Sequence, residues 1–180
     1  MAVTTRRNRT PAEQPTGTSA TAAAHVWAVA RIALAWIFLW AFLDKTFGLG
    51  HETPAAKAWT DGGSPTMGFL KNSPEGPFAG LYHDLAGQTW ADWLFMIGLA
   101  GIGAALLLGV AMRAAAVAGG LLLVLMWTAV LPPANNPFLD DHLVYTIVLV
   151  GLALVGAGDT LGLGRWWGNT ALVRKLPILK

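Results

Sequence analysis

The chain has 180 residues, of which 54% are hydrophobic and only 12% charged, and its formal net charge is +2. Ordinary globular domains carry about 25% charged residues, so too few polar side chains are present to cover a soluble core. The chain contains no cysteine, which excludes thiolate catalysis, disulfide exchange and thiolate metal sites, and its basic residues form no cluster typical of nucleic-acid binding.

The first 24 residues are rich in Thr, Ala and Pro and lack large apolar side chains. Such a segment cannot bury enough apolar surface to fold, so we predict a disordered cytoplasmic tail over residues 1–24. It does not resemble a secretory signal peptide, because the apolar run that follows begins late and is too long for one.

The first predicted membrane span covers residues from about 26 to 47. It contains Arg31, and it ends at Asp44 and Lys45. An arginine at the centre of a membrane helix costs about 3 kcal/mol on insertion scales. Arg31 can avoid this cost by extending to the cytoplasmic surface, or it can lie buried and pair with Asp159 or with backbone carbonyl groups.

Residues 48–89 form a polar segment that contains four prolines and is too irregular to span a membrane. We predict a long outer loop here, with short helices over residues 65–72 and 77–87. The second of these has Pro at its start and Gly at its end, the usual asymmetry of a helix. Trp90 and Trp93 then mark the return to the membrane, since tryptophan is enriched at membrane interfaces.

Between Leu94 and Leu131 the chain runs for 38 residues with a single charge, Arg113. One helix of that length would be about 57 Å long, whereas the hydrocarbon layer is about 30 Å thick. We therefore predict two spans, over about 93–110 and 114–131, that fold back at Arg113.

Small residues recur every four positions on both of these spans. They are Gly101, Ala105 and Gly109 on the second span, and Ala115 and Gly119 on the third. This pattern favours close packing of helices within one bundle, with a homodimer face as the alternative.

The fourth predicted span covers about 142–157, and either Asp140 or Asp141 can cap its first turn. Residues 169–180 are predicted to form a basic cytoplasmic tail. The resulting fold class is all-α, a polytopic integral membrane four-helix bundle over residues 25–168. A long outer loop connects helices 1 and 2 of this bundle.

Four spans place both ends of the chain on one side of the membrane. That side carries nine of the twelve basic residues, whereas the other side carries three basic and eight of the ten acidic residues. Basic residues are retained in the cytoplasm, so both termini are predicted to be cytoplasmic. We therefore expect a multi-pass protein of the bacterial inner (plasma) membrane, with an outer face of net charge about −5.

Several stretches of the chain resemble the DoxX family of membrane proteins. They are "FLDKTFG" at the end of the first span, "LLLGVAMRAAAVAGGLLLVLMW" over Leu106–Trp127, and "DDHLVYTIVLVGLALVGAGDTLGLGRWW" from Asp140. The outer-loop sequences "GGSPTMGFL" and "GPFAGLYHDLAG" are more similar to the DoxD-type branch, the membrane subunit of thiosulfate:quinone oxidoreductase. The resemblance implies a four-helix membrane bundle and, for some members, electron transfer from thiosulfate to quinone with a partner subunit.

A quinone site requires flat apolar walls and hydrogen-bond donors to the two carbonyl oxygens of the ring. We predict such a pocket between the outer ends of the first and fourth spans, with Lys45 held by Asp140 or Asp141. The candidate catalytic residues are Lys45, His83, His142 and Tyr145, and the candidate cofactor-binding residues are Trp40, Asp44, Asp140 and Asp141. In the alternative interpretation Lys45 anchors the helix at the interface, Asp140 is a helix cap and the aromatic residues form an outer belt.

The leading functional interpretation is a DoxX-type inner-membrane subunit in quinone-linked oxidoreduction, acting with a partner subunit or secreted protein. The alternative is a non-catalytic membrane scaffold or assembly factor that docks a partner through its outer loop. The sequence has no metal-ligand spacing and no flavin or dinucleotide motif, so the expected cofactor is quinone. The negative outer face disfavours thiosulfate, because it repels a dianion over about 10 Å.

Overall fold

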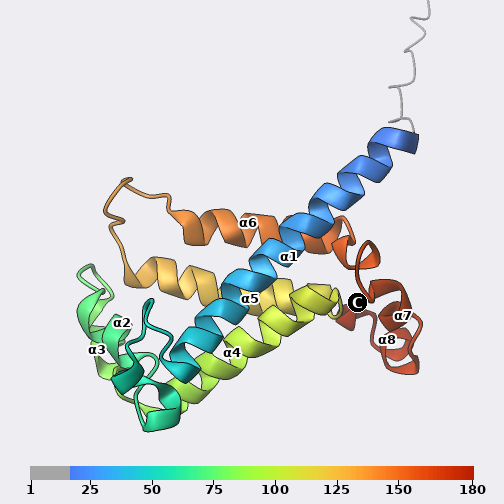
Figure 1. Ribbon diagram of the computed structural model, residues 1–180. Helices are drawn as coiled ribbons and strands as arrows, with labels where there is room; N and C mark the ends of the chain where they lie inside the picture. Colours follow the sequence, from blue (N-terminus) through green and yellow to red (C-terminus); the bar gives the residue numbers. More distant parts are fainter. Residues whose placement is uncertain (1–16) are drawn as a thin grey trace, which may run out of the picture.

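The computed structural model describes residues 17–180, and within that range every regular element is a helix. The four longest are α1 (Gly17–Phe47), α4 (Thr89–Leu108), α5 (Met112–Ala129) and α6 (Asp141–Leu154). They lie side by side, with α1 and α5 running in one direction and α4 and α6 in the other (Figure 1). The prediction of an all-α chain is confirmed for the described residues.

The four long helices define two ends of the molecule (Figure 1). The terminal end comprises the start of α1, the α4–α5 turn at 109–111 and residues 155–180. The loop end comprises residues 48–88 and 130–140. The start of α1 and the C-terminal residue lie at the same end of the molecule (Figure 1).

Three of the described helices, α1, α4 and α5, are long and apolar enough to cross a membrane. They contain 31, 20 and 18 residues, which corresponds to about 46, 30 and 27 Å. Helix α6 is apolar but has only 14 residues, or about 21 Å, and is shorter than the hydrocarbon layer of about 30 Å. The first three predicted spans therefore coincide with helices that have the length and apolar composition of a membrane span.

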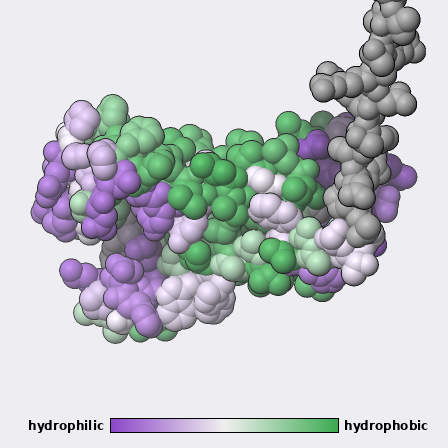
Figure 2. All heavy atoms as spheres, turned by 90° about the horizontal axis from the view of Figure 1, so that it is seen from above, coloured by the Kyte–Doolittle hydropathy of each residue, from purple (hydrophilic) through white to green (hydrophobic). Residues whose placement is uncertain are grey.

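The surface between the two ends is apolar. Figure 2 shows a broad hydrophobic zone over the long helices, with hydrophilic residues gathered at the ends. Ile97 on α4, Val117 on α5 and Ile147 on α6 are each more than 60% exposed. An apolar surface of this extent is unfavourable in water and is the surface that lipid requires.

Helix α1 begins at Gly17, about nine residues before the predicted start of the first span. The prediction of disorder is therefore wrong for residues 17–24, where alanine, the strongest helix former, extends the apolar helix outward. The remainder of the predicted tail, residues 1–16, lies outside the described residues.

The turn between α4 and α5 lies at residues 109–111, a few positions before the predicted fold-back at Arg113. Gly109 ends α4 in the left-handed conformation, with φ at +70°, which glycine adopts without strain. Arg113 lies in the first turn of α5, where its backbone N–H donates to the Lys180 carbonyl and its Nη1 donates to the Pro177 carbonyl. Arg113 therefore holds the C-terminal residues of the chain against the start of α5.

Short helices occupy both ends of the molecule. At the loop end they are η1 (Ala55–Lys57), η2 (Trp59–Asp61), α2 (Met67–Asn72) and α3 (Ala79–Leu85). At the terminal end they are η3 (Ala157–Asp159), α7 (Gly164–Gly168), α8 (Ala171–Lys175) and η4 (Pro177–Leu179). The two short helices predicted between the first and second spans are confirmed as α2 and α3.

The small residues of α4 and α5 differ in what they contact. On α5, Ala115 and Gly119 are buried in the helix packing, as predicted. On α4 the packed glycine is Gly103, which faces Leu39 of α1, whereas Gly101 is exposed and a side chain there would meet no atom within 4 Å. The predicted packing role within the chain is therefore wrong for Gly101, whereas Ala105 packs against the core and Gly109 is buried against Gly158.

We predict that Gly103→Ala destabilises the protein. A Cβ at this position would lie 2.7 Å from the Leu39 Cγ and 3.1 Å from the Leu39 backbone nitrogen, so α1 and α4 must separate. Overpacking of this kind costs about 1–3 kcal/mol. Thermal unfolding in detergent measures the effect, and Gly101→Ala on the same helix is the matched control, for which we expect no loss of stability. Equal melting temperatures for the two variants would contradict this packing.

Candidate functional site

At the loop end, a buried carboxylate fixes the chain that leaves α1. Asp44 is only 1% exposed and accepts hydrogen bonds from the backbone N–H groups of His51, Glu52 and Thr53 at 3.2, 3.0 and 2.8 Å. A carboxylate that accepts three N–H bonds has most of its hydrogen-bonding capacity satisfied. Asp44, a predicted cofactor-binding residue, therefore holds residues 51–53 against the end of α1.

Two further buried side chains attach the short helices of the loop end to the long helices. Asp92, in the first turn of α4, accepts hydrogen bonds from Ser64 Oγ, from Thr66 Oγ1 and from the Thr66 backbone N–H, at 2.9, 2.6 and 3.0 Å. Tyr82 of α3 donates to the Leu125 carbonyl at 2.8 Å. The sequence interpretation missed both residues, although a lone aspartate between Trp90 and a long apolar run is a detectable signal.

An aromatic group lies along α1 at the loop end. The Trp40 ring meets the His51 ring edge to face, with centroids 5.0 Å apart, and Trp36 lies one turn away at 5.7 Å from Trp40. Trp36 is 57% exposed on the apolar surface, whereas His51 is exposed among polar residues. We call Trp36, Trp40 and His51 the α1 aromatic group, and it connects the lipid-facing surface to the polar loop end.

The predicted residues of the fourth span form a second, separate group. His142 Nδ1 lies 2.7 Å from Asp140 Oδ2 and 3.6 Å from Asp141 Oδ1. Asp140 also caps α6 by accepting from the Leu143 backbone N–H, which confirms its role as a helix cap. Tyr145 packs against the hydrophobic core.

The structure does not bring these two groups together. Helices α1 and α6 are in contact near Trp27 and Gly151, toward the terminal end, and they diverge toward the loop end (Figure 1). Among the described residues, Lys45 forms no ion pair with either Asp140 or Asp141. The predicted pocket between the outer ends of these helices is therefore wrong in its geometry, because α1 leans away from α6 to pack on α4.

His83, the remaining predicted catalytic residue, is exposed on α3. Its neighbour Tyr82 is buried and anchors the helix, so His83 points away from that anchor. For metal binding, one ligand atom from each of Asp140, Asp141 and His142 lies within 4.8 Å of the others. These three residues could hold a cation, but the mutual hydrogen bond of Asp140 and His142 already accounts for their proximity.

At the terminal end, the main polar feature is a completely buried arginine. Arg31 is 0% exposed, and its Nη1 donates to the carbonyl oxygens of Leu106 and Leu107, the latter at 2.9 Å. Its Nη2 donates to the carbonyl oxygens of Thr160 and Leu161 at 3.3 and 2.7 Å. Of the two possibilities left open by the sequence, burial against backbone carbonyls is confirmed.

The position of Arg31 has a clear electrostatic cause. The last carbonyl groups of a helix have no partner within the helix and carry the negative end of its dipole. Leu106 and Leu107 are among these groups on α4, so the guanidinium caps α4 from inside the protein. The Nη2 group of Arg31 holds the segment after η3 in place through the carbonyl oxygens of Thr160 and Leu161. The Arg31 Nε is buried and has no hydrogen-bond partner among the described residues.

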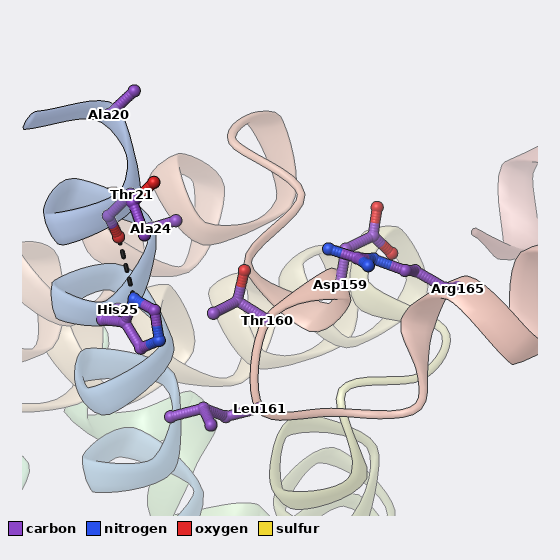
Figure 3. Close-up of a pocket in the computed structure, with 8 residues that line it drawn as sticks. All are labelled: Ala20, Thr21, Ala24, His25, Asp159, Thr160, Leu161 and Arg165. Atoms are coloured by element: carbon purple, nitrogen blue, oxygen red, sulfur yellow. Dashed lines mark hydrogen bonds between the residues drawn. The ribbon is translucent and has the colours of Figure 1, made fainter. Parts of the chain in front are cut away.

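A hollow of about 550 Å³ opens beside this connection. It lies between the first turns of α1 and the connection that contains η3, and we call it the α1 hollow (Figure 3). Its lining comprises Ala20, Thr21, Ala24 and His25 from α1, and Asp159, Thr160, Leu161 and Arg165. The sequence interpretation placed no site here, because His25, Asp159 and Arg165 are distant in the chain and form no motif.

No family model, curated protein or solved structure matches this chain. Its sites are therefore interpreted from their own residues. The loop end offers an aromatic surface beside the donor His51, and Lys45 lies on the same end of α1. The terminal end offers an open hollow lined by both acidic and basic groups.

We predict that Arg31→Met strongly destabilises the protein, because four carbonyl oxygens would lose a charged donor in a buried site. Each hydrogen bond to a charged group contributes about 1.5–3 kcal/mol, so the expected loss is at least about 3 kcal/mol. Thermal unfolding in detergent measures it. Arg174→Met, on the exposed surface of α8, is the control and should be neutral. Comparable stability of the two variants would show that the buried contacts contribute little.

Proposed function

We propose that the chain is a DoxX-type inner-membrane subunit that crosses the bilayer four times. Helix α6 packs along α5 and exposes Ile147 and Val150 on the same apolar zone as the other three helices. A helix of about 21 Å can cross where the bilayer thins locally or where the following residues extend it. The long segment between α1 and α4 then forms the outer loop.

The charges of the described residues support the orientation with both ends in the cytoplasm. The terminal end, counted together with Arg31 on α1 and Arg113 in the first turn of α5, carries six basic residues and one acidic residue, Asp159. The loop end, counted together with the adjoining helix-end residues Asp44, Lys45, Asp92 and Asp141, carries three basic and eight acidic residues. Since basic residues are retained on the cytoplasmic side, we place the terminal end there and the loop end outside.

Single cysteines test this orientation, because the natural chain has none. We expect Asp61→Cys at the loop end to react with a membrane-impermeant maleimide in spheroplasts. Arg174→Cys at the terminal end should react only after the membrane is permeabilised. Both side chains are exposed, so both should label fully in detergent, which serves as the control. Labelling of both positions in intact spheroplasts would contradict an even number of spans.

For the reaction, we propose quinone-linked oxidoreduction together with a partner subunit docked at the loop end. The resemblance to the DoxX family suggests this chemistry, and the α1 aromatic group is the observation that carries it. Trp36 presents a flat apolar wall to the lipid, from which quinone arrives, and His51 lies at the polar boundary, where protons are available. Lys45 lies on the same end of α1, about 140° around the helix from Trp40, so its long side chain has to extend around the helix end to donate a hydrogen bond to a quinone carbonyl.

This placement modifies the site predicted from the sequence. Trp40 and Lys45 remain in it, His51 is added, and the α6 residues His142 and Tyr145 are not needed for ring binding. The electrons must come from the partner, since the chain lacks cysteine and shows no flavin motif. Thiosulfate as the electron source would have to bind that partner, because the loop end carries net negative charge.

Lys45→Met tests the quinone site. We expect the purified wild-type protein to retain extractable quinone and the variant to bind it about tenfold more weakly, because a charged donor is lost. Lys71→Met, an exposed lysine of α2 at the same end, is the control. Quinone is measured in organic extracts, and quinol formation is measured in membranes. A variant that retains quinone and activity at normal yield would remove Lys45 from the site.

The second candidate function is a non-catalytic scaffold or assembly factor. It is favoured by the buried hydrogen bonds of Asp44, Asp92 and Tyr82, which hold the loop-end segment in one conformation suited to docking a protein. Wild-type protein that contains no quinone but copurifies with a defined partner would support the scaffold and contradict the quinone-linked role.

A further inference from the structure

We propose that the α1 hollow binds the head group of a phosphatidylethanolamine molecule from the cytoplasmic leaflet. This inference goes beyond the proposed redox role and does not depend on it. It uses the membrane placement of the helices and the residues that line the hollow.

The hollow lies at the level expected for lipid head groups. Helices α4 and α6 end at Leu108 and Leu154, near the connection that forms one wall of the hollow. The other wall is the first part of α1, residues 17–25, which precedes the long apolar stretch and spans about 13 Å. A site at the boundary between apolar helices and the polar terminal end is reached laterally by a lipid.

The charged residues of the hollow make few bonds to the rest of the described chain. Asp159 and Arg165 lie near one another beside the hollow, yet they form no ion pair (Figure 3). Within the described residues, Asp159 pairs only with the half-exposed Lys180, at the long distance of 4.0 Å, and the Arg165 guanidinium has no partner. Opposite charges that share a hollow without pairing can be bridged by a ligand that carries both charges.

The remaining lining residues fit the rest of such a ligand. The His25 Nδ1 is hydrogen-bonded to the Thr21 carbonyl at 2.8 Å, which leaves its other ring nitrogen available. In the neutral ring this nitrogen is an acceptor, which suits the ammonium group of the ligand, whereas the Thr160 hydroxyl can donate to a phosphate together with Arg165. Ala24 and Leu161 supply apolar surface for the glycerol and the start of the acyl chains. The volume of about 550 Å³ lies within the usual range of about 300–1,000 Å³ for ligand pockets.

Arg31 makes the hollow a preformed site. Its guanidinium binds the carbonyl oxygens of Thr160 and Leu161, so the backbone that forms the wall is held from behind. The lining is therefore ordered without a ligand, and less conformational entropy is lost when one binds.

The charges of Asp159 and Arg165 are expected to distinguish among the head groups of common phospholipids. Phosphatidylethanolamine carries a primary ammonium that can donate hydrogen bonds to Asp159 while its phosphate meets Arg165. Phosphatidylcholine carries a methylated ammonium without N–H groups. Phosphatidylglycerol has no cation, so Asp159 would repel it. We therefore expect a preference for phosphatidylethanolamine over both.

The test uses the full chain reconstituted in nanodiscs that contain equal amounts of the three lipids. After transfer to detergent, native mass spectrometry identifies the lipids that stay bound. We expect phosphatidylethanolamine to be enriched about two- to fivefold, the range that an exposed ion pair supplies. Asp159→Asn should remove the preference over phosphatidylglycerol, and Arg165→Gln should reduce retention of all phospholipids.

Two controls test whether lipid retention depends on the α1 hollow and on the whole lipid. Arg174→Gln removes an exposed charge at the same end but outside the hollow, and it should retain the wild-type preference. Soluble phosphoethanolamine added to the wild-type protein should not displace the lipid, because it lacks acyl chains. Equal retention of the three lipids by the wild type, an unchanged preference in Asp159→Asn, or displacement by soluble phosphoethanolamine would each overturn the proposal.

Discussion

The burial of one guanidinium against backbone carbonyl groups, two of them at a helix end, determines how the terminal end is built. Arg31 lies in the first long helix, yet its hydrogen bonds reach the end of α4 and the connection that follows α6. A charge in an apolar environment is stable only when it is hydrogen-bonded, and helix-end carbonyls need donors. Each side of this contact satisfies the requirement of the other. Three parts of the chain, far apart in sequence, are thereby fixed to one point.

The loop end uses the same principle with the opposite sign of charge. Asp44 and Asp92 are buried carboxylates. They accept hydrogen bonds from N–H and O–H groups of the segment between α1 and α4. In lipid, burial of apolar side chains does not drive segments together, since the solvent is equally apolar. Polar contacts at the membrane boundaries therefore contribute more to the position of the loop-end segment than they would in a soluble protein. This explains why Asp44, predicted from the sequence as a cofactor-binding residue, has structural partners instead.

The sequence predicted the elements well and their mutual positions poorly. Long apolar runs, prolines and capping residues are local signals, and they located α2, α3, α4, α5 and the Asp140 cap to within a few residues. The predicted site failed because it required the outer ends of the first and fourth helices to be adjacent. Which face of α1 packs on which neighbour depends on contacts such as Leu39 against Gly103, and no periodicity in a uniformly apolar helix reveals them.

The different construction of the two ends bears on where ligands can enter. At the loop end the buried acids are saturated by the chain itself, so the residues still available are aromatic rings and single donors such as His51 and Lys45. That set suits a planar ligand that enters from the lipid. At the terminal end both terminal nitrogens of Arg31 are hydrogen-bonded to the chain, whereas the side chains of Asp159 and Arg165 beside it accept or donate no hydrogen bond within the described chain. The proposed lipid head group would bond to both side chains, and because Arg31 fixes the same connection, a bound lipid would stabilise the contact between α1 and the end of α4.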